Sequence, residues 1–192
     1  MFRRILSDCM KLSSRAASIV RGGVLKLKVI ALGGHCEGLP RVSSSVTWKY
    51  PPHEGIRISR GLDIGPGCFF DVPPGGMLTI EEKVKITGNV YISCLNRVEI
   101  GRNTLIAEHC SIRDAEHLTS LDKPINQQGL KAGEIIIGED VWICKGSLIL
   151  GCAVISSGTI LGANSMLKNV ETEENCFYVG APARKIKKRQ LC

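Results

Sequence analysis

The fold is decided by residues 137–170, which read IGEDVW-ICKGSL-ILGCAV-ISSGTI-LGANSM-LKNV. An aliphatic residue opens each group of six, and a small or β-branched residue stands four positions later in the five complete groups. The aliphatic positions are Ile137, Ile143, Ile149, Ile155, Leu161 and Leu167, and the small or β-branched ones are Val141, Ser147, Ala153, Thr159 and Ser165.

The same pair of positions recurs upstream. Five further groups carry an aliphatic residue followed four positions later by a small or β-branched one, so that ten groups obey both rules. A repeat of six fits neither an α-helix, with its period of about 3.6, nor a strand that alternates with a period of 2. The upstream pairs are Ile64/Cys68, Ile80/Val84, Ile86/Val90, Ile100/Thr104 and Ile106/Cys110.

Short strands joined by tight turns explain such a repeat, because every sixth side chain can then point into a narrow core. We therefore predict an all-β solenoid whose coils stack about 4.8 Å apart and hydrogen-bond to one another. Three groups of six make one triangular coil of about 18 residues. We place the solenoid at residues 56–189 and a capping segment at residues 1–55.

The composition is that of one soluble globular domain. The chain has 192 residues, of which 44% are hydrophobic, 22% charged and only 5% aromatic, so that aliphatic and small residues must build the core. The net charge of +7 favours an anionic ligand, such as nucleic acid, an acidic membrane surface or a phosphorylated cofactor. Nucleic acid is the weakest of these, because the sequence has no basic face interleaved with aromatic residues.

Cysteine usage and the N-terminus indicate a cytoplasmic protein. The nine cysteines are odd in number and form no C-x-x-C pair, which is typical of reduced thiols rather than of disulfides or structural zinc. No apolar run approaches the roughly 20 residues that span a bilayer. Ser7, Asp8 and Lys11 interrupt the apolar part of any signal peptide.

The first residues predict a short basic amphipathic helix. Two roles stay open for it: capping the open end of the solenoid, where strand edges are unpaired, or touching an anionic membrane surface. Capping is preferred. The prediction rests on Phe2, Ile5, Leu6 and Cys9 at helical spacing beside Arg3, Arg4 and Lys11.

A polar loop interrupts the repeat. The phase holds at Ile112 and returns only at Ile137, and the loop at residues 113–134 contains His117. Long polar excursions from a rigid scaffold are where binding and chemistry concentrate. Asp114 and Glu116 lie close enough along the chain to orient a histidine ring or hold its charge.

The sequence resembles the hexapeptide-repeat acyltransferases, whose fold is a left-handed parallel β-helix. The resemblance spans about residues 56–189 and rests on D-x-x-H at residues 114–117, I-x-I-G-x-x-V-W-I at residues 135–143 and V-G-x-P-A-x-x-I at residues 179–186. It is closest to the O-acetyltransferases of colanic acid, capsule and lipopolysaccharide, with the maltose and galactoside acetyltransferases more distant. It implies a homotrimer with each active site between neighbouring subunits.

The resemblance implies that His117 is the general base and that Trp142 lines the acyl-transfer site, with backbone amides near Trp142 stabilising the oxyanion. A sugar hydroxyl attacks a thioester poorly unless its proton is removed, and imidazole suits that role near neutral pH. Asp114 completes the catalytic set. Three-histidine zinc chemistry, as in the gamma-class carbonic anhydrases, needs a different spacing from residues 35, 53, 109 and 117, so no metal is expected.

Acetyl-coenzyme A is the implied cosubstrate. In the resembling family, backbone amides at the positions of Cys144, Lys145 and Ala163 pair with the pantetheine amides. Cys144 replaces the usual glycine and narrows this space. The remaining matches are Gly180 and Pro182, which turn the chain beside the adenine, and Lys168 and Arg184, the cations for the phosphates.

These features predict an acetyl-coenzyme A-dependent O-acetyltransferase acting on a sugar of a cell-surface polysaccharide or its precursor, by direct transfer in a ternary complex. Two alternatives stay open. One is an N-acetyltransferase acting on an amino-sugar nucleotide, which the same base could serve. The other is a non-catalytic solenoid scaffold that binds a partner, because a repeat alone defines only a fold.

Overall fold

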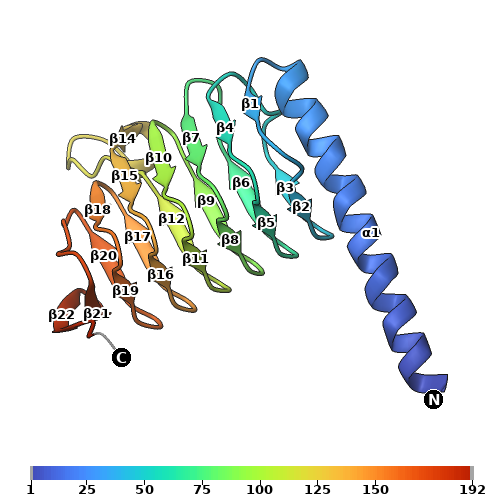
Figure 1. Ribbon diagram of the computed structural model, residues 1–192. Helices are drawn as coiled ribbons and strands as arrows, with labels where there is room; N and C mark the ends of the chain where they lie inside the picture. Colours follow the sequence, from blue (N-terminus) through green and yellow to red (C-terminus); the bar gives the residue numbers. More distant parts are fainter. Residues whose placement is uncertain (1, 191–192) are drawn as a thin grey trace.

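The groups of six form a triangular parallel β-solenoid in the computed structural model, with a helix at one end and a hairpin at one corner (Figure 1). The structure describes residues 2–190, and the side chains of residues 13–190. This architecture confirms the predicted fold class, a left-handed parallel β-helix with an N-terminal helical segment and an excursion loop.

Three sheets form the faces of the solenoid, and each coil adds one strand to each sheet; the second sheet ends with two further strands, β21 and β22, which pair antiparallel. The first sheet contains β1 (His35–Cys36), β4 (Ile56–Ile58), β7 (Met77–Ile80), β10 (Arg97–Ile100), β15 (Glu134–Ile137) and β18 (Ala153–Ile155). The second contains β2 (Arg41–Val42), β5 (Asp63–Ile64), β8 (Lys85–Ile86), β11 (Leu105–Ile106), β16 (Trp142–Ile143), β19 (Ile160–Leu161), β21 (Cys176–Gly180) and β22 (Ala183–Lys188). The third contains β3 (Thr47–Trp48), β6 (Phe69–Asp71), β9 (Tyr91–Ser93), β12 (Ser111–Arg113), β17 (Leu148–Leu150) and β20 (Met166–Lys168).

The aliphatic position of each group points inward and stacks on its equivalents in the neighbouring coils. In the first sheet, parallel pairing aligns five isoleucines, none more than 1% exposed. Removing such side chains from water is the main stabilising contribution, about 1.5–3 kcal/mol for each one. The stack consists of Ile58, Ile80, Ile100, Ile137 and Ile155.

The solenoid begins at His35, not at residue 56 as the sequence boundary placed it. Cys36, Val42 and Trp48 already stand six residues apart and pair with Ile58, Ile64 and Phe70 of the next coil. The first coil escaped notice because cysteine and tryptophan replace aliphatic residues in it.

Helix α1 (Phe2–Ala31) is far longer than the short helix predicted. No proline interrupts it, and a glycine inside it has a packing reason: a Cβ on Gly22 would lie 1.7 Å from the carbonyl oxygen of Pro40. The helix ends where Gly33, at φ +87°, turns the chain; the N–H groups of Gly33 and Gly34 donate to the carbonyls of Ile30 and Val29.

The second half of α1 covers the first coil. Leu25 and Val29 are buried against it. Arg21 Nε donates to the Val42 carbonyl at 2.9 Å and Lys26 Nζ to the Gly38 carbonyl at 2.7 Å, so the helix also satisfies edge carbonyls. The side chains of Phe2, Ile5, Leu6 and Cys9, on which the helix prediction rested, lie outside the described residues. Within the described part of the chain, no helix has the length and apolar character needed to cross a membrane.

Candidate functional site

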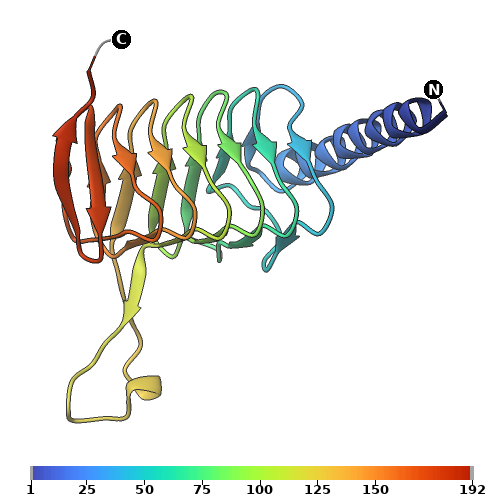
Figure 2. The ribbon, with the colours of Figure 1, turned by 90° about the horizontal axis from the view of Figure 1, so that it is seen from below.

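The polar loop is a hairpin that leaves one corner of the solenoid and projects into solvent (Figure 2). Strands β13 (Ala115–His117) and β14 (Leu130–Ala132) pair antiparallel, with His117 opposite Leu130. A short 3-10 helix, η1 (Ile125–Gln127), lies near the tip, where the Gln128 side chain bonds the backbone of Ser120. The hairpin connects strand β12 of the third sheet to strand β15 of the first sheet.

Asp114 fixes the base of this hairpin. Its side chain is fully buried, and its oxygens accept hydrogen bonds from the N–H groups of Leu95, Asn96 and Arg97 at 2.8, 2.7 and 2.9 Å. Burial raises the pKa of the Asp114 carboxyl, and these backbone donors oppose that rise. On the other arm, Gly133 N–H donates to the Asp114 carbonyl at 2.6 Å. The structure therefore shows Asp114 as an anchor, and no hydrogen bond joins it to His117 within residues 13–190.

His117 is exposed on the first arm of the hairpin. Glu116, its neighbour, forms an ion pair with Lys168 of β20 at 2.7 Å, so Glu116 does not orient the imidazole. This ion pair ties the hairpin to the third sheet. The sequence did not indicate this pair, because 52 positions separate the two residues and each had another expected partner, the His117 ring for Glu116 and a phosphate for Lys168.

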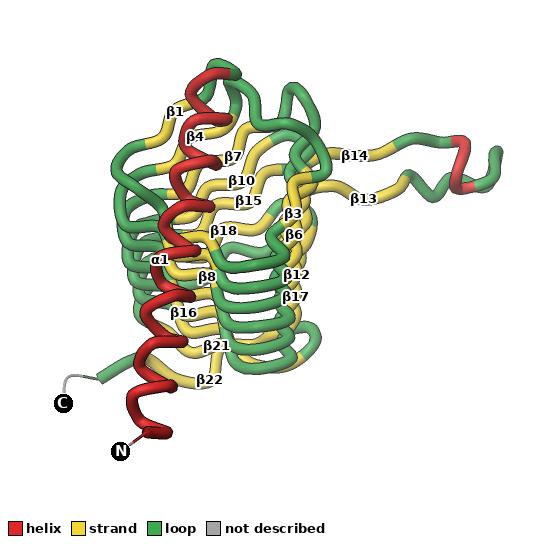
Figure 3. Tube along the Cα trace, turned by 90° about the vertical axis from the view of Figure 1, so that its right-hand side faces the viewer, coloured by secondary structure: helices red, strands yellow, loops and turns green. Residues whose placement is uncertain are grey.

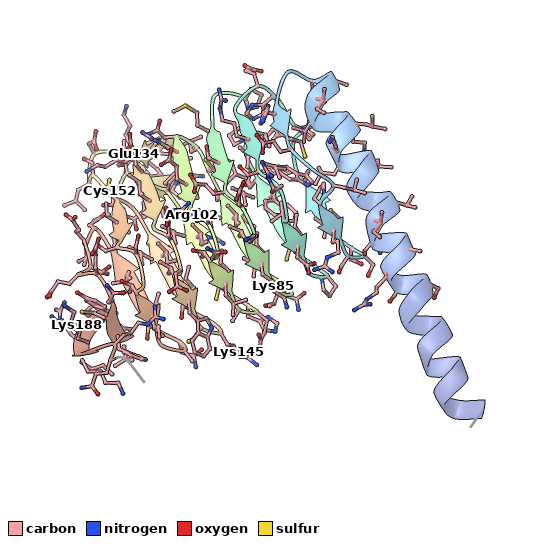
Figure 4. The ribbon with its side chains drawn as sticks, viewed as in Figure 1. Lys85, Arg102, Glu134, Lys145, Cys152 and Lys188 are labelled. Atoms are coloured by element: carbon pink, nitrogen blue, oxygen red, sulfur yellow. The ribbon has the colours of Figure 1, made fainter. Side chains whose placement is uncertain are left out.

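Three predicted cofactor residues lie together at a different corner, between the second and third sheets. Cys144 and Lys145 form the turn after β16, and Ala163 lies in the equivalent turn after β19. Lys145 thus sits at the opposite edge of the coils from Cys152, which lies beside the base of the hairpin (Figure 4). The Asn164 N–H donates to the Lys145 carbonyl at 2.9 Å, and this hydrogen bond holds the two turns against each other.

The backbone amides of this corner differ in their availability. The N–H groups of Trp142 and Cys144 donate to the carbonyls of Thr159 and Leu161 at 3.0 and 2.9 Å. The hydrogen bonds between coils already use these two amides, so the expected oxyanion contact from amides near Trp142 needs a different donor. Among the described residues, neither the Lys145 nor the Ala163 N–H donates to a protein acceptor, and both could bind a ligand carbonyl.

Trp142 lies on the second sheet and is 46% exposed. The hairpin that carries His117 leaves the corner opposite that sheet, between the third and first sheets (Figure 3). A single chain therefore does not bring Trp142 and His117 together.

The Cys144 thiol shows no sign of activation. Burial raises its pKa, and the structure places no cation against its sulfur within the described residues. The neighbouring Lys145 instead pairs with Glu108 at 3.6 Å. A raised pKa keeps the group as a thiol, which is the unreactive form.

The remaining predicted cofactor residues are divided between two places. Gly180 and Pro182 form the turn between β21 and β22, where Gly180 N–H donates to Ser165 Oγ at 3.0 Å, and Arg184 follows in β22 with its side chain exposed. Lys168, by contrast, lies at the hairpin corner with Glu116. The structure thus separates the two cations expected to bind the phosphates.

The other histidines have structural surroundings. His53 is buried, accepts from Gly55 N–H at Nδ1 and has its Nε2 3.3 Å from the Val72 carbonyl. His35 faces Glu37, and His109 occupies a turn at φ +61°. Among the described residues, no three His, Cys, Asp or Glu side chains are placed to hold a metal ion.

Comparisons with known proteins find relatives whose names describe acyltransferases. No model of a known protein family matches the sequence. WbbJ of Escherichia coli K12, whose name describes a lipopolysaccharide biosynthesis O-acetyl transferase, is 29% identical over 141 residues, which cover 69% of this chain and 71% of WbbJ. A dTDP-4-amino-4,6-dideoxy-D-glucose acyltransferase of Escherichia coli is 26% identical over 144 residues, 71% of this chain and 73% of that protein.

A solved structure has the same fold. A mutant of AntD, an N-acyltransferase from Bacillus cereus, in complex with dTDP-4-amino-4,6-dideoxyglucose and coenzyme A, matches with a TM-score of 0.65 at 24% identity. The match covers 79% of this chain and 81% of AntD.

Proposed function

Because the chain is a member of the hexapeptide-repeat acyltransferases, we propose that it transfers an acetyl group from acetyl-coenzyme A to a hydroxyl of a sugar in a cell-surface polysaccharide or its precursor. The name of WbbJ supports both the sugar and the oxygen acceptor. The observation that carries the proposal is the anchored hairpin, which holds an exposed imidazole away from the coil surface.

His117 has the chemistry that this reaction requires. The imidazole accepts the proton of the sugar hydroxyl while the sugar oxygen forms its bond to the acetyl carbon and the carbon–sulfur bond breaks. It then returns that proton to the departing thiolate sulfur. Acetyl-coenzyme A supplies the acetyl group as an activated thioester. General-base assistance of this kind contributes about 10²- to 10⁴-fold in rate.

The corner between the second and third sheets fits the pantetheine arm. The unbonded N–H groups of Lys145 and Ala163 are donors for its amide carbonyls, one coil apart. Arg184 lies on the same side of the molecule, just beyond Gly180 and Pro182. Its guanidinium group is suited to binding phosphate oxygens. The Cys144 side chain occupies space beside this path and restricts the size of the acyl group.

We propose that two copies complete each site within a homotrimer. The separation of His117 from Trp142 in one chain supports this arrangement, because a neighbouring copy can bring its second sheet beneath the projecting hairpin. Lys168 stays a candidate phosphate contact for a coenzyme bound to that neighbouring copy. Alternatively, its ion pair with Glu116 serves to position the hairpin.

The test is His117→Ala, assayed with acetyl-coenzyme A and a panel of sugar acceptors by released thiol and product mass. We expect kcat to fall about 10²- to 10⁴-fold while coenzyme A affinity, measured by calorimetry, is unchanged. His35→Ala is the matched control, because His35 is also exposed but lies at the far end of the solenoid. Undiminished turnover in the His117→Ala variant would show that His117 is not the general base.

An amino-sugar nucleotide is the second candidate acceptor. The similarity to the dTDP-4-amino-4,6-dideoxy-D-glucose acyltransferase favours it. The same panel separates the two, since an O-acetyl product is cleaved by mild base and an N-acetyl product is not.

A further inference from the structure

Helix α1 carries an apolar stripe that the solenoid does not cover. Leu25 and Val29 face the first coil, whereas residues three and four positions apart on the other side of the helix are exposed. These residues form the α1 stripe, defined by Ile19 (43% exposed), Val20 (66%), Val24 (48%), Leu27 (71%) and Ile30 (50%).

The helix also carries most of the net charge of the chain. Residues 1–32 hold seven of the 25 Lys and Arg residues but one of the 18 Asp and Glu residues, so that their net charge is +6 out of the total of +7. Arg15 and Lys28 lie on α1 with exposed side chains. Every charged residue of the helix from residue 13 onward is basic.

An apolar groove adjoins the stripe. It lies between α1 and the first coil, has a volume of about 680 Å³, and is lined in part by Val20, Val24, Leu32, Trp48 and Tyr50. Lys28 and Lys49 also line it. Tryptophan and tyrosine beside basic side chains are the composition that proteins place at the boundary between lipid headgroups and acyl chains.

We infer that α1 docks this protein on an anionic phospholipid surface. An amphipathic helix with an apolar face and a basic polar face lies in the plane of a membrane interface, and anionic lipids strengthen its binding. The helix lies at the end of the solenoid away from the hairpin, so docking leaves the hairpin corner free (Figure 2). The inference does not depend on the identity of the acetyl acceptor.

The basic side chains of α1 argue against a second copy of the chain as the partner that covers the α1 stripe. If α1 helices packed together through their stripes, the flanking side chains would be Arg and Lys on both partners. Like charges placed beside a helix seam destabilise the pairing. An anionic surface neutralises the same charges.

The test is co-sedimentation of the full chain with vesicles of phosphatidylcholine alone and of phosphatidylcholine with about one third phosphatidylglycerol. We expect binding to the anionic vesicles that weakens as salt is raised. Val20→Glu with Leu27→Glu should lower this binding at least tenfold. Met77→Glu with Leu121→Glu is the matched control, because it makes the same charge change at two exposed apolar residues remote from α1 and should bind as the parent does.

A second pair of substitutions isolates the contribution of charge to vesicle binding. Arg15→Gln with Lys28→Gln keeps the α1 stripe and should weaken binding to anionic vesicles only. Failure of the parent chain to bind anionic vesicles, or equal binding by the Val20→Glu/Leu27→Glu variant, overturns the inference. So does a change in that variant's mass by light scattering without lipid, which would assign the stripe to contacts between copies. Transfer to a water-soluble acceptor, assayed in the same variants, tests the proposed function separately.

Discussion

The carboxylate of Asp114 accepts three backbone hydrogen bonds at the point where the chain leaves the solenoid. Because the side chain is fully buried, water cannot replace any of those bonds. The N–H groups of residues 95–97 would be left without acceptors if the carboxylate were lost. We therefore expect its contribution to the proposed site to be positional, acting through the arm that carries His117.

We predict that Asp114→Asn destabilises the fold by about 1.5–3 kcal/mol, because the amide group offers one acceptor and directs an N–H₂ at a backbone donor. Urea unfolding followed by circular dichroism measures this. Asp122→Asn is the control, since Asp122 is exposed near the hairpin tip and its substitution should change the unfolding midpoint little. Equal midpoints for the two variants would contradict the anchoring role.

At this scale the sequence located the hairpin but suggested other partners for its side chains than those the structure shows. The motif at residues 114–117 located the hairpin, but proximity along the chain suggested that Asp114 and Glu116 serve His117. In space, Asp114 turns inward to residues 95–97 and Glu116 reaches Lys168. Asp114 lies between β12 and β13, where the chain leaves the solenoid, so its side chain can turn into the coil. Glu116 and His117 are adjacent on β13, and adjacent side chains on a strand point to opposite sides.

At the scale of elements, the corners of the solenoid are as specific as its faces. Gly146 has φ +71°, and a Cβ there would lie 2.3 Å from Oδ1 of Asn164 in the coil above. Asn164 itself has φ +55°, so each corner combines a left-handed turn with a tight contact between coils. The residue type at such a turn is therefore restricted both by its own backbone conformation and by the contact with the neighbouring coil.

We predict that Gly146→Ala destabilises the solenoid by about 2–3 kcal/mol, from backbone strain and the contact with Asn164 together. Gly75→Ala isolates the backbone contribution, about 1 kcal/mol, because Gly75 has φ +95° with nothing within 4 Å of the added Cβ. Adding Asn164→Gly to Gly146→Ala should recover the difference. Thermal unfolding of the four proteins measures both effects, and a double variant no more stable than Gly146→Ala would contradict the contact.

The sequence predicted the elements well wherever the repeat was regular and less well at its ends. Coils built on isoleucine and leucine were placed correctly. The first coil, with Cys36 and Trp48 at aliphatic positions, was not recognised. The length of α1 was underestimated. A glycine in the middle of a helix is usually unfavourable, and the reason for Gly22 is its close approach to Pro40, which lies eighteen positions away in the sequence.

At the scale of the whole molecule, the two groups of residues that make up the proposed site lie on different sides of one chain. The hairpin with His117 leaves one corner, and Trp142 with the open amides of Lys145 and Ala163 belongs to the second sheet and its corner with the third. A rigid solenoid cannot fold over to join them. Association of copies is then the route by which the parts can meet, and sequence periodicity contains no information on that geometry.

Complementation between two inactive variants tests this arrangement. His117→Ala and Trp142→Ala should each lose most acetyl transfer when assayed alone. If each site takes His117 from one chain and Trp142 from its neighbour, subunit exchange in an equal mixture should restore activity at about a quarter of the sites. Mass spectrometry of the intact assemblies confirms that exchange has occurred. A mixture that exchanges subunits yet stays inactive would place both residues' function within one chain, and the two-copy site would be abandoned.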